Sequence, residues 1–287
     1  MAARYVHVDV FARGSLSGNG LVVVLDGEGW SVETMQRVTQ EMRQFESIFL
    51  SSVSARGAVA RVFTVEEELD FAGHPVLGAA AVLHRELDPQ APTREWLLEL
   101  PVGPIKVRTE MRAPAVLAEM DQGLPRFGER LAAVQGAGVL EALGLNGTDL
   151  DARLPLQVVS TGLAYLMVPV AGPALARAAI RGHDFEARLA ALGAKFVLVI
   201  DASAAEIRTW DNFGRVEDVA TGSAAGPAVA YLARHLHVAT PLKLAQGRFA
   251  GRPSELVVRI DERGHVHVSG EVWPVARGSF EFTRSST

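Results

Sequence analysis

Short apolar segments, many of them rich in valine, recur along the 287-residue chain and predict a protein built mainly of strands. In the first part of the chain we expect strands at residues 5–11, 21–25, 47–51, 58–63, 96–100, 105–109 and 115–120. In the second part we expect them at residues 157–160, 164–170, 196–200, 256–260, 266–268 and 270–282. Gly-bearing turns such as Asp26-Gly27 separate several of these segments.

Apolar residues at helical spacing mark fewer segments. Met35, Val38 and Met42 recur at that spacing and predict a helix that ends near Gln44. Ser31 suits the N-cap position of this helix. Further helices are expected at residues 76–87, 139–143, 175–180 and 186–192, and in the second half of the segment 216–235.

Two segments at comparable places along the chain resemble each other. FAGHPVLGAAAVLH (71–84) and VATGSAAGPAVAYLA (219–233) each place a loop of small residues directly before an alanine-rich helix. A turn-rich passage begins near Asp121. We therefore expect an N-terminal half, residues 1–120, and a similar C-terminal half, residues 121–287, with the last strands free to return to the first half.

Composition narrows the classes of function. Hydrophobic residues make up 48% and charged residues 21%, which is typical of a globular protein. The net charge is −5 and no segment concentrates Lys or Arg, so we expect neither a nucleic acid nor a membrane as partner. The N-terminal segment lacks the apolar core of a signal peptide, and we expect a cytoplasmic protein. The absence of cysteine excludes disulfides and cysteine nucleophiles.

The two small-residue loops suggest a ligand site. Gly73 and Gly222 precede the alanine-rich helices, and a helix N-terminus offers unpaired backbone N–H groups and partial positive charge. Glycine lets the oxygen atoms of a ligand approach these amides closely. Neither GxxxxGK[ST] nor a strand-helix GxGxxG is present, so a small carboxylate is favoured over a nucleotide.

Three ionisable residues stand near these features. Glu46 lies between apolar neighbours, and loss of water disfavours the charged form of a carboxylate, which suits it to exchange a proton. His74 lies in the first loop and Asp218 directly before the second. Structural alternatives stay open at this point: a solvated helix end for Glu46, a braced turn for His74 and a helix cap for Asp218.

Other reactive side chains offer less. His265 and His267 share one face of a predicted strand, but no third metal ligand is apparent, so a solvent-facing strand is favoured over a metal site. Ser223 lies in TGSAAG and not in GxSxG, which gives no support to a hydrolase nucleophile.

Several segments together resemble the phenazine-biosynthesis isomerase (PhzF-like) family, which shares the diaminopimelate epimerase fold. The resemblance covers nearly the whole chain and is carried by VDVFARGSLSGNGLVVVLD, FESIF, VFTVEEELDFAGHPVLGAA, STGLAYLMVPV, EDVATGSAAGPAVAYL and QGRFAGRPSEL. It implies an α+β fold of two similar β-rolls, each wrapped around a central helix, with the active site in the cleft between them. It also implies a homodimer.

The same resemblance implies a cofactor-free and metal-free isomerase. Glu46 matches the family's catalytic glutamate, which moves a proton between carbon atoms of a small, often cyclic, amino acid-like carboxylate. His74 and Asp218 match the other two catalytic positions. Further substrate contacts are expected from the loop residues Gly73, Gly222 and Ser223, and from Asn19, Phe45, Ser47 and Thr221.

Some positions depart from the family pattern. Gly20 replaces the proline of a Gly-Asn-Pro turn, Val219 replaces another proline, and Phe45 stands where a small polar residue is common. We expect a proton and double-bond shift in a biosynthetic, secondary-metabolism type of pathway, such as antibiotic biosynthesis. Two alternatives are another lyase or carbon–carbon bond-cleaving reaction on the same scaffold, and a catalytically inactive dimeric binding protein.

Overall fold

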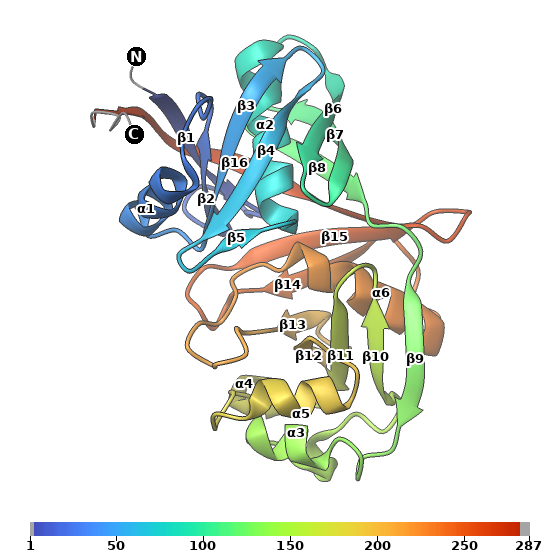
Figure 1. Ribbon diagram of the computed structural model, residues 1–287. Helices are drawn as coiled ribbons and strands as arrows, with labels where there is room; N and C mark the ends of the chain where they lie inside the picture. The colour runs from blue at the N-terminus through green and yellow to red at the C-terminus, as the bar shows by residue number, and fades with distance from the viewer. Residues whose placement is uncertain (1–2, 282–287) are drawn as a thin grey trace. The chain divides into compact units, whose positions relative to one another are not determined.

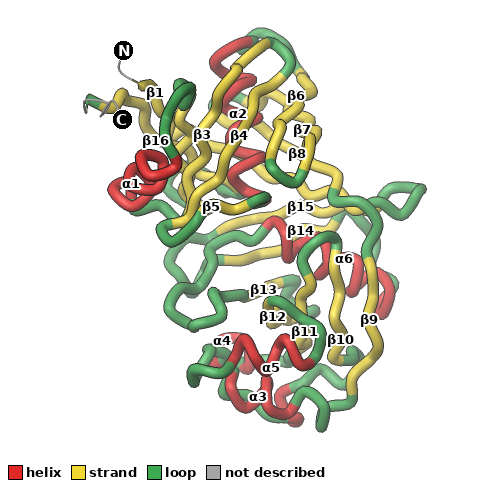
Figure 2. Tube along the Cα trace, in the orientation of Figure 1, coloured by secondary structure: helices red, strands yellow, loops and turns green. Residues whose placement is uncertain are grey.

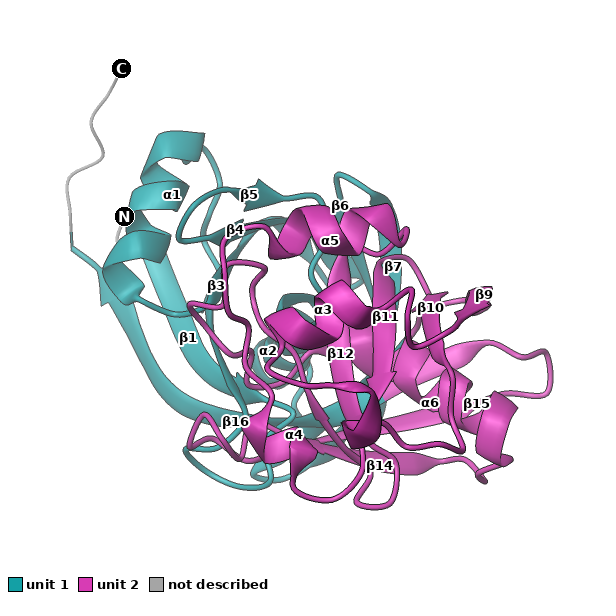
Figure 3. Ribbon diagram, turned by 90° about the horizontal axis from the view of Figure 1, so that it is seen from below, with its two compact units in different colours: residues 1–120, 269–287 teal, residues 121–268 magenta. Residues whose placement is uncertain are grey.

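The computed structural model describes residues 3–281, which divide into two compact units (Figure 3). Unit 1 holds residues up to 120 together with those from 269 onward, and unit 2 holds residues 121–268. Strands predominate over helices in the chain (Figure 2).

Unit 1 contains nine strands or parts of strands and two helices among its described residues. The strands are β1 (Ala3–Val10), β2 (Asn19–Val24), β3 (Glu46–Ser54), β4 (Gly57–Thr64), β5 (Glu68–Leu69), β6 (Thr93–Leu100), β7 (Gly103–Arg112), β8 (Ala115–Asp121) and most of β16 (Val266–Phe280). The helices are α1 (Val32–Met42) and α2 (Gly73–Leu87).

The strands of unit 1 close on themselves around α2. Their order is β1-β2-β3-β4-β6-β7-β8-β16, and β16 also pairs with β1. The neighbours β2 and β3 are parallel, as are β4 and β6. Helix α2 packs against β1, β2, β3, β4, β6 and β7 (Figure 1). Its first twelve residues are all buried, so it is the central helix of this unit.

The composition of α2 explains how a helix fits inside these strands. The middle of the helix is rich in glycine and alanine, which occupy little space. At Gly78 an added Cβ would lie 2.4 Å from the Cδ2 of Leu21 and 3.0 Å from the Cγ2 of Val10. The backbone of α2 therefore approaches β1 and β2 too closely for any side chain at that position.

Helix α1 covers the other face of the same strands. Its residues Met35 and Val38 belong to a buried cluster with Phe49 and Phe63 of β3 and β4. Ser31 caps the helix, because its side chain accepts a hydrogen bond from the Thr34 N–H, as the sequence predicted.

Unit 2 is organised around a second alanine-rich helix, α6 (Gly222–Leu236), which packs against β10, β11, β12 and β15. Its strands run in the order β15-β14-β13-β12-β11-β10-β9. They are β9 (Arg126–Leu131), β10 (Leu156–Ser160), β11 (Ala164–Pro169), β12 (Phe196–Asp201), β13 (Glu206–Arg208), β14 (Leu242–Gln246) and β15 (Ser254–Ile260). The shorter helices are α3 (Ala137–Ala142), η1 (Gly147–Asp149), α4 (Ala174–Arg177) and α5 (Phe185–Ala191).

The last strand differs from its prediction. The sequence predicted two strands, 266–268 and 270–282, but β16 is continuous from Val266 to Phe280, and Phe282 lies outside the described residues. Gly270 lies within this strand, and an added Cβ there would lie 2.3 Å from the Cδ1 of Phe11, so the glycine allows close packing against Phe11. Pro274 is accommodated where the register against β1 shifts.

Four strands among the described residues, β5, β9, β13 and β14, were not predicted. None of the helices within residues 3–281 is long and apolar enough to cross a membrane.

Candidate functional site

Glu46 and His74 lie within hydrogen-bond distance of each other and are buried in unit 1. Glu46 is the first residue of β3, and His74 is the second residue of α2. The Nδ1 of His74 lies 2.9 Å from the Oε2 of Glu46. Only 7% of Glu46 and 5% of His74 is exposed, so the structural alternative of a solvated helix end for Glu46 is wrong.

The local backbone explains why Glu46 faces inward. Helix α1 ends at Arg43 in a left-handed conformation, with a φ of 52°, and the chain then turns into β3. Glu46 pairs with Leu21 in the parallel neighbour β2. Leu21 packs against Gly78 of α2, so the face of β3 that carries Glu46 points toward α2.

One nitrogen of His74 is left for a ligand. The carboxylate of Glu46 accepts a hydrogen bond from Nδ1, and the amide nitrogen of Asn19 lies 3.5 Å from the same ring atom. The Nε2 of His74 is buried and has no hydrogen-bond partner among residues 3–281. A buried polar atom in that state is favourable only if a ligand or water satisfies it.

Ser47 and Phe45 lie differently from Glu46. Successive side chains of a strand point to opposite faces, so Ser47 shares the face of Phe49, which packs under α1. The hydroxyl of Ser47 is therefore not gathered with Glu46 and His74. Phe45 precedes the strand and is 38% exposed.

The second loop lies in unit 2 and carries Asp218. Its Oδ1 accepts a hydrogen bond from the Ala220 N–H at 3.3 Å, and its Oδ2 accepts one from the Thr221 hydroxyl. Thr221, and not Asp218, is the N-cap residue of α6. The structural alternative of a helix cap for Asp218 is therefore wrong.

Gln246 holds this loop, and sequence reasoning missed it. Its Oε1 accepts from the Thr221 N–H at 2.9 Å, and its Nε2 donates to the Asp218 carbonyl at 2.8 Å. The residue ends β14, a strand that was not predicted, and 25 positions separate it from Thr221. The only signal was its place in the segment QGRFAGRPSEL.

Ser223 and Gly222 have partners from other strands and segments of unit 2. The Ser223 hydroxyl lies 2.7 Å from the hydroxyl of Tyr165 on β11. The Gly222 carbonyl accepts from the Gln122 side chain at 3.0 Å. These contacts fix the start of α6.

Glu217 has a structural partner. Arg208 donates to both of its carboxylate oxygens, at 2.9 and 2.6 Å, and is itself buried. The guanidinium also donates to backbone carbonyls and lies over the rings of Trp210 and Phe249. Glu217 therefore anchors the segment before Asp218.

The two helices begin earlier than the sequence predicted and include both glycines, so Gly73 and His74 lie in the first turn of α2 and not in a loop before it. Gly73 is the first residue of α2 and Gly222 the first residue of α6. The preceding residues, Ala72 and Thr221, make no side-chain cap hydrogen bond to their helices. Each helix therefore begins with amides that no capping side chain occupies.

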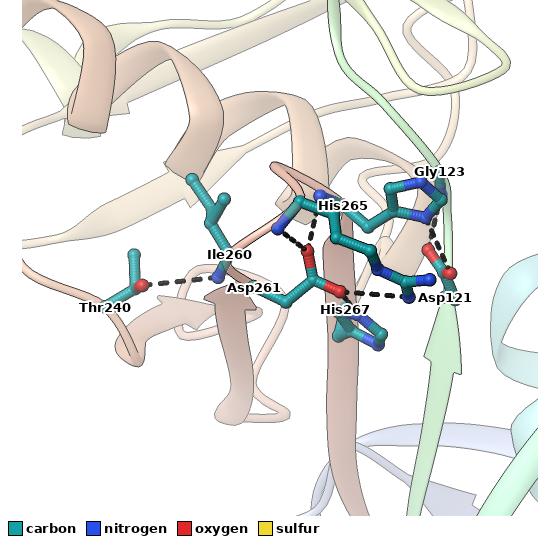
Figure 4. Close-up of polar contacts among 8 residues, drawn as sticks. Asp121, Gly123, Thr240, Ile260, Asp261, His265 and His267 are labelled. Carbon is teal, nitrogen blue, oxygen red and sulfur yellow. Dashed lines mark hydrogen bonds and ion pairs between the residues drawn. The ribbon is translucent and has the colours of Figure 1, made fainter.

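The side chains of His265 and His267 pair with different aspartates. His265 Nδ1 lies 2.8 Å from Asp121, and His267 Nε2 lies 3.1 Å from Asp261 (Figure 4). Asp261 also accepts the backbone N–H of Arg263 and of His265. Within residues 3–281 no group of three or more His, Cys, Asp or Glu side chains is arranged to hold a metal ion.

A surface hollow of about 450 Å³ lies elsewhere in unit 1, beside β6. It is lined by Ala55, Arg56, Thr93, Arg94, Glu95, Trp96, Leu97 and Lys106. None of the candidate residues lines this hollow.

This chain is similar to proteins of a known family. Residues 8–278 match the family of phenazine biosynthesis-like proteins. The chain is 32% identical to the trans-2,3-dihydro-3-hydroxyanthranilate isomerase of Pseudomonas chlororaphis, over 96% of this chain and 98% of that protein.

Two solved structures are similar over almost their full length. One, from Pseudomonas aeruginosa, is described as a predicted epimerase and is 45% identical, with a TM-score of 0.91 over 98% of this chain and 100% of the other. The second, a PhzF-family phenazine biosynthesis protein from Bacillus anthracis, is 22% identical with a TM-score of 0.83 and the same coverage, and it supports the fold alone. The chain therefore belongs to the PhzC-PhzF family of phenazine biosynthesis-like proteins and is an isomerase of that family.

Proposed function

We propose that this isomerase moves a proton between two carbon atoms of a small, cyclic, amino acid-like carboxylate and thereby shifts a double bond. The observation that carries the proposal is the buried pair of Glu46 and His74, with its 2.9 Å contact. A buried carboxylate beside an imidazole can accept a proton and return it without bulk water competing.

Glu46 acts as both base and acid in this proposal. It removes a proton from an activated carbon of the substrate, while the electrons of that C–H bond move into the conjugated system. The same proton is then returned to another carbon of that system. Glu46 ends as the carboxylate, and neither an oxidant nor a reductant is consumed.

His74 supports the carboxylate and the substrate at different atoms. Nδ1 faces Glu46, so Nε2 is the atom that reaches a heteroatom of the substrate. A neutral ring that donates from Nδ1 accepts at Nε2, whereas a ring that accepts at Nδ1 donates from Nε2. The ring can therefore respond to the protonation of Glu46.

Asp218 is proposed to bind a second polar group of the substrate. Both of its oxygens already have donors from its own loop, which favours the charged carboxylate as an acceptor. The uncapped amides at Gly73 in unit 1 and at Gly222 in unit 2 are each proposed as contacts for a substrate oxygen, as are Ser223, Thr221 and Asn19. Ser47 contributes its backbone.

The first substrate to test is trans-2,3-dihydro-3-hydroxyanthranilate, which the curated relative's name specifies. We further propose a biosynthetic role and a dimer, for which light scattering should give twice the 30.7 kDa of one chain.

The substitution Glu46→Gln tests the central assignment. It keeps the shape of the side chain but removes its basicity, so kcat is expected to fall by about 100- to 10,000-fold. The reaction is followed by NMR in deuterated water with trans-2,3-dihydro-3-hydroxyanthranilate, which also reports deuterium at carbon.

The matched control is Glu66→Gln, which alters an exposed glutamate of the same unit. That variant should keep normal turnover. Near-normal turnover by Glu46→Gln would exclude Glu46 as the base.

A further inference from the structure

The loop that carries Asp218 is held by one buried side chain from a strand far along the chain. Gln246 is 1% exposed and makes three hydrogen bonds to this loop. We propose that Gln246 is a positioning residue that fixes the Asp218 carboxylate for the reaction. This inference rests on the proposed function, in which Asp218 touches the substrate.

The hydrogen bonds give the amide one orientation. Oε1 must face the Thr221 N–H, because that backbone group can only donate. Nε2 then donates to the Asp218 carbonyl at 2.8 Å and to the Thr221 hydroxyl at 2.9 Å. The flipped amide would place two donors against each other at the Thr221 N–H and two acceptors against each other at the Asp218 carbonyl.

The same orientation sets the direction of the next hydrogen bond. The Thr221 hydroxyl accepts from Gln246, so its own proton is directed to the Oδ2 of Asp218. The other oxygen, Oδ1, accepts from the Ala220 N–H. Gln246 thus determines the position of a carboxylate that it does not touch.

The backbone next to Gln246 leaves little freedom for adjustment. Gly247 has a φ of 81°, and an added Cβ there would lie 2.5 Å from the Val219 carbonyl oxygen. The end of β14 therefore lies directly against the loop. A side chain shorter than glutamine cannot be compensated by a small movement of the strand.

Loss of Gln246 should impair the chemical step more than binding. A displacement of a reacting group by about 1 Å can cost about 100-fold in rate. For Gln246→Leu we expect kcat to fall by about 10- to 100-fold with KM changed by less than about threefold, because the contact acts on the transition state. If the leucine variant does not fold, Gln246→Glu replaces it in the same measurement. That side chain keeps the shape and the oxygen that accepts from the Thr221 N–H, but loses the donor to the Asp218 carbonyl.

The matched control is Gln157→Leu in the same unit. Gln157 is also buried, donates to the Gly128 carbonyl at 2.7 Å and lies 2.7 Å from the Nε2 of His235. Its replacement should lower stability without a comparable loss of kcat. Equal losses of kcat in Gln246→Leu and Gln157→Leu would show that Gln246 only stabilises the fold, and would overturn the inference.

A double-mutant cycle separates positioning from independent effects. In the Asp218→Asn background, Gln246→Leu should cause almost no further loss of kcat on trans-2,3-dihydro-3-hydroxyanthranilate, because it acts through Asp218. Multiplied losses would overturn the inference while leaving the proposed function intact. Full activity of Asp218→Asn alone would instead reject the proposed role of Asp218, and the inference with it.

Hydrogen exchange supplies a readout without turnover. The Thr221 amide donates to Gln246, so its exchange should be faster in Gln246→Leu and unchanged in Gln157→Leu. Unchanged protection at Thr221 in Gln246→Leu would overturn the positioning role whatever the substrate.

Discussion

The environment of Glu46 is decided by its place on a strand. Neighbouring apolar residues in the sequence marked it as unusual, and β3 turns it toward α2 and His74. Strand alternation sends Ser47 to the other face, beside Phe49. The sequence could predict Glu46 as a candidate, but not which neighbour shares its face, because that depends on where the strand begins.

Gly78 offers a test of how tightly α2 is enclosed. Alanine normally stabilises a helix relative to glycine by about 1 kcal/mol. Here the added methyl group would lie 2.4 Å from Leu21, inside a packed core. We expect Gly78→Ala to lower the free energy of unfolding by about 1–3 kcal/mol, because the cost of overpacking exceeds the gain in helix propensity.

Urea unfolding of the Gly78 variant beside Gly14→Ala measures this effect. A Cβ on Gly14 would meet no heavy atom within 4 Å, so that control should stay near the wild type. A stabilised Gly78→Ala would show that α2 has room to move within unit 1.

At the scale of whole elements, local signals were reliable and long-range ones were not. Ser31 capped α1 as expected, because a cap depends on residues three positions apart. The need for glycine at position 270 of β16 comes instead from Phe11, which is distant in the sequence and leaves no room for a Cβ there. The role of Gln246 could not be predicted for the same reason, since its partners Asp218 and Thr221 lie far from it in the sequence, in the loop before α6.

A buried polar network joins α2 to two strands of unit 1. The Thr109 hydroxyl accepts from the indole N–H of Trp96 at 3.0 Å and lies 2.8 Å from the Nδ1 of His84. His84 Nε2 faces the Ala91 carbonyl at 3.0 Å, and in the tautomer that donates there, Nδ1 accepts from Thr109. One hydroxyl thus satisfies two buried side chains.

Replacing that hydroxyl should be costly. Thr109→Val keeps the shape but leaves Trp96 and His84 without this partner, at about 1–3 kcal/mol for each group. Unfolding followed by tryptophan fluorescence measures the loss. Thr93→Val, at an exposed position of β6, is the control and should have little effect. A loss no larger than the control's would mean that water replaces the hydroxyl.

At the scale of the molecule, the sequence predicted two halves because a small-residue segment followed by an alanine-rich helix occurs twice. Unit 1 contains Gly73 and α2, and unit 2 contains Gly222 and α6. The return of residues from 269 onward to unit 1 depends on pairing between β16 and β1, which no local pattern specifies.

Two aspartates of unit 2 make the stability of the molecule depend on acidity. Burial opposes the charge of Asp261, but hydrogen bonds from His267 and from the amides of His265 and Arg263 outweigh it and hold its pKa well below the usual range. For Asp121, burial is likewise outweighed by the Gly123 amide and by His265, and its pKa is lowered. Both charged forms are favoured by folding (Figure 4).

The sign of the effect follows from linkage. A carboxyl group whose pKa is lower in the folded state stabilises the fold fully above its unfolded pKa, about 3.9 for aspartate, and loses this contribution as the pH falls toward the folded value. We therefore expect Asp261→Asn to have a lower melting temperature than the wild type at pH 7, and the difference to shrink as the pH falls below about 4. Calorimetry of the full chain, at pH values from 7 down to below about 4, measures the melting temperature of unit 2 and its change with pH. Glu262→Gln, which alters the exposed neighbour, is the control and should show neither. A difference that stayed constant with pH would mean that Asp261 stabilises the turn through its shape and not through its charge.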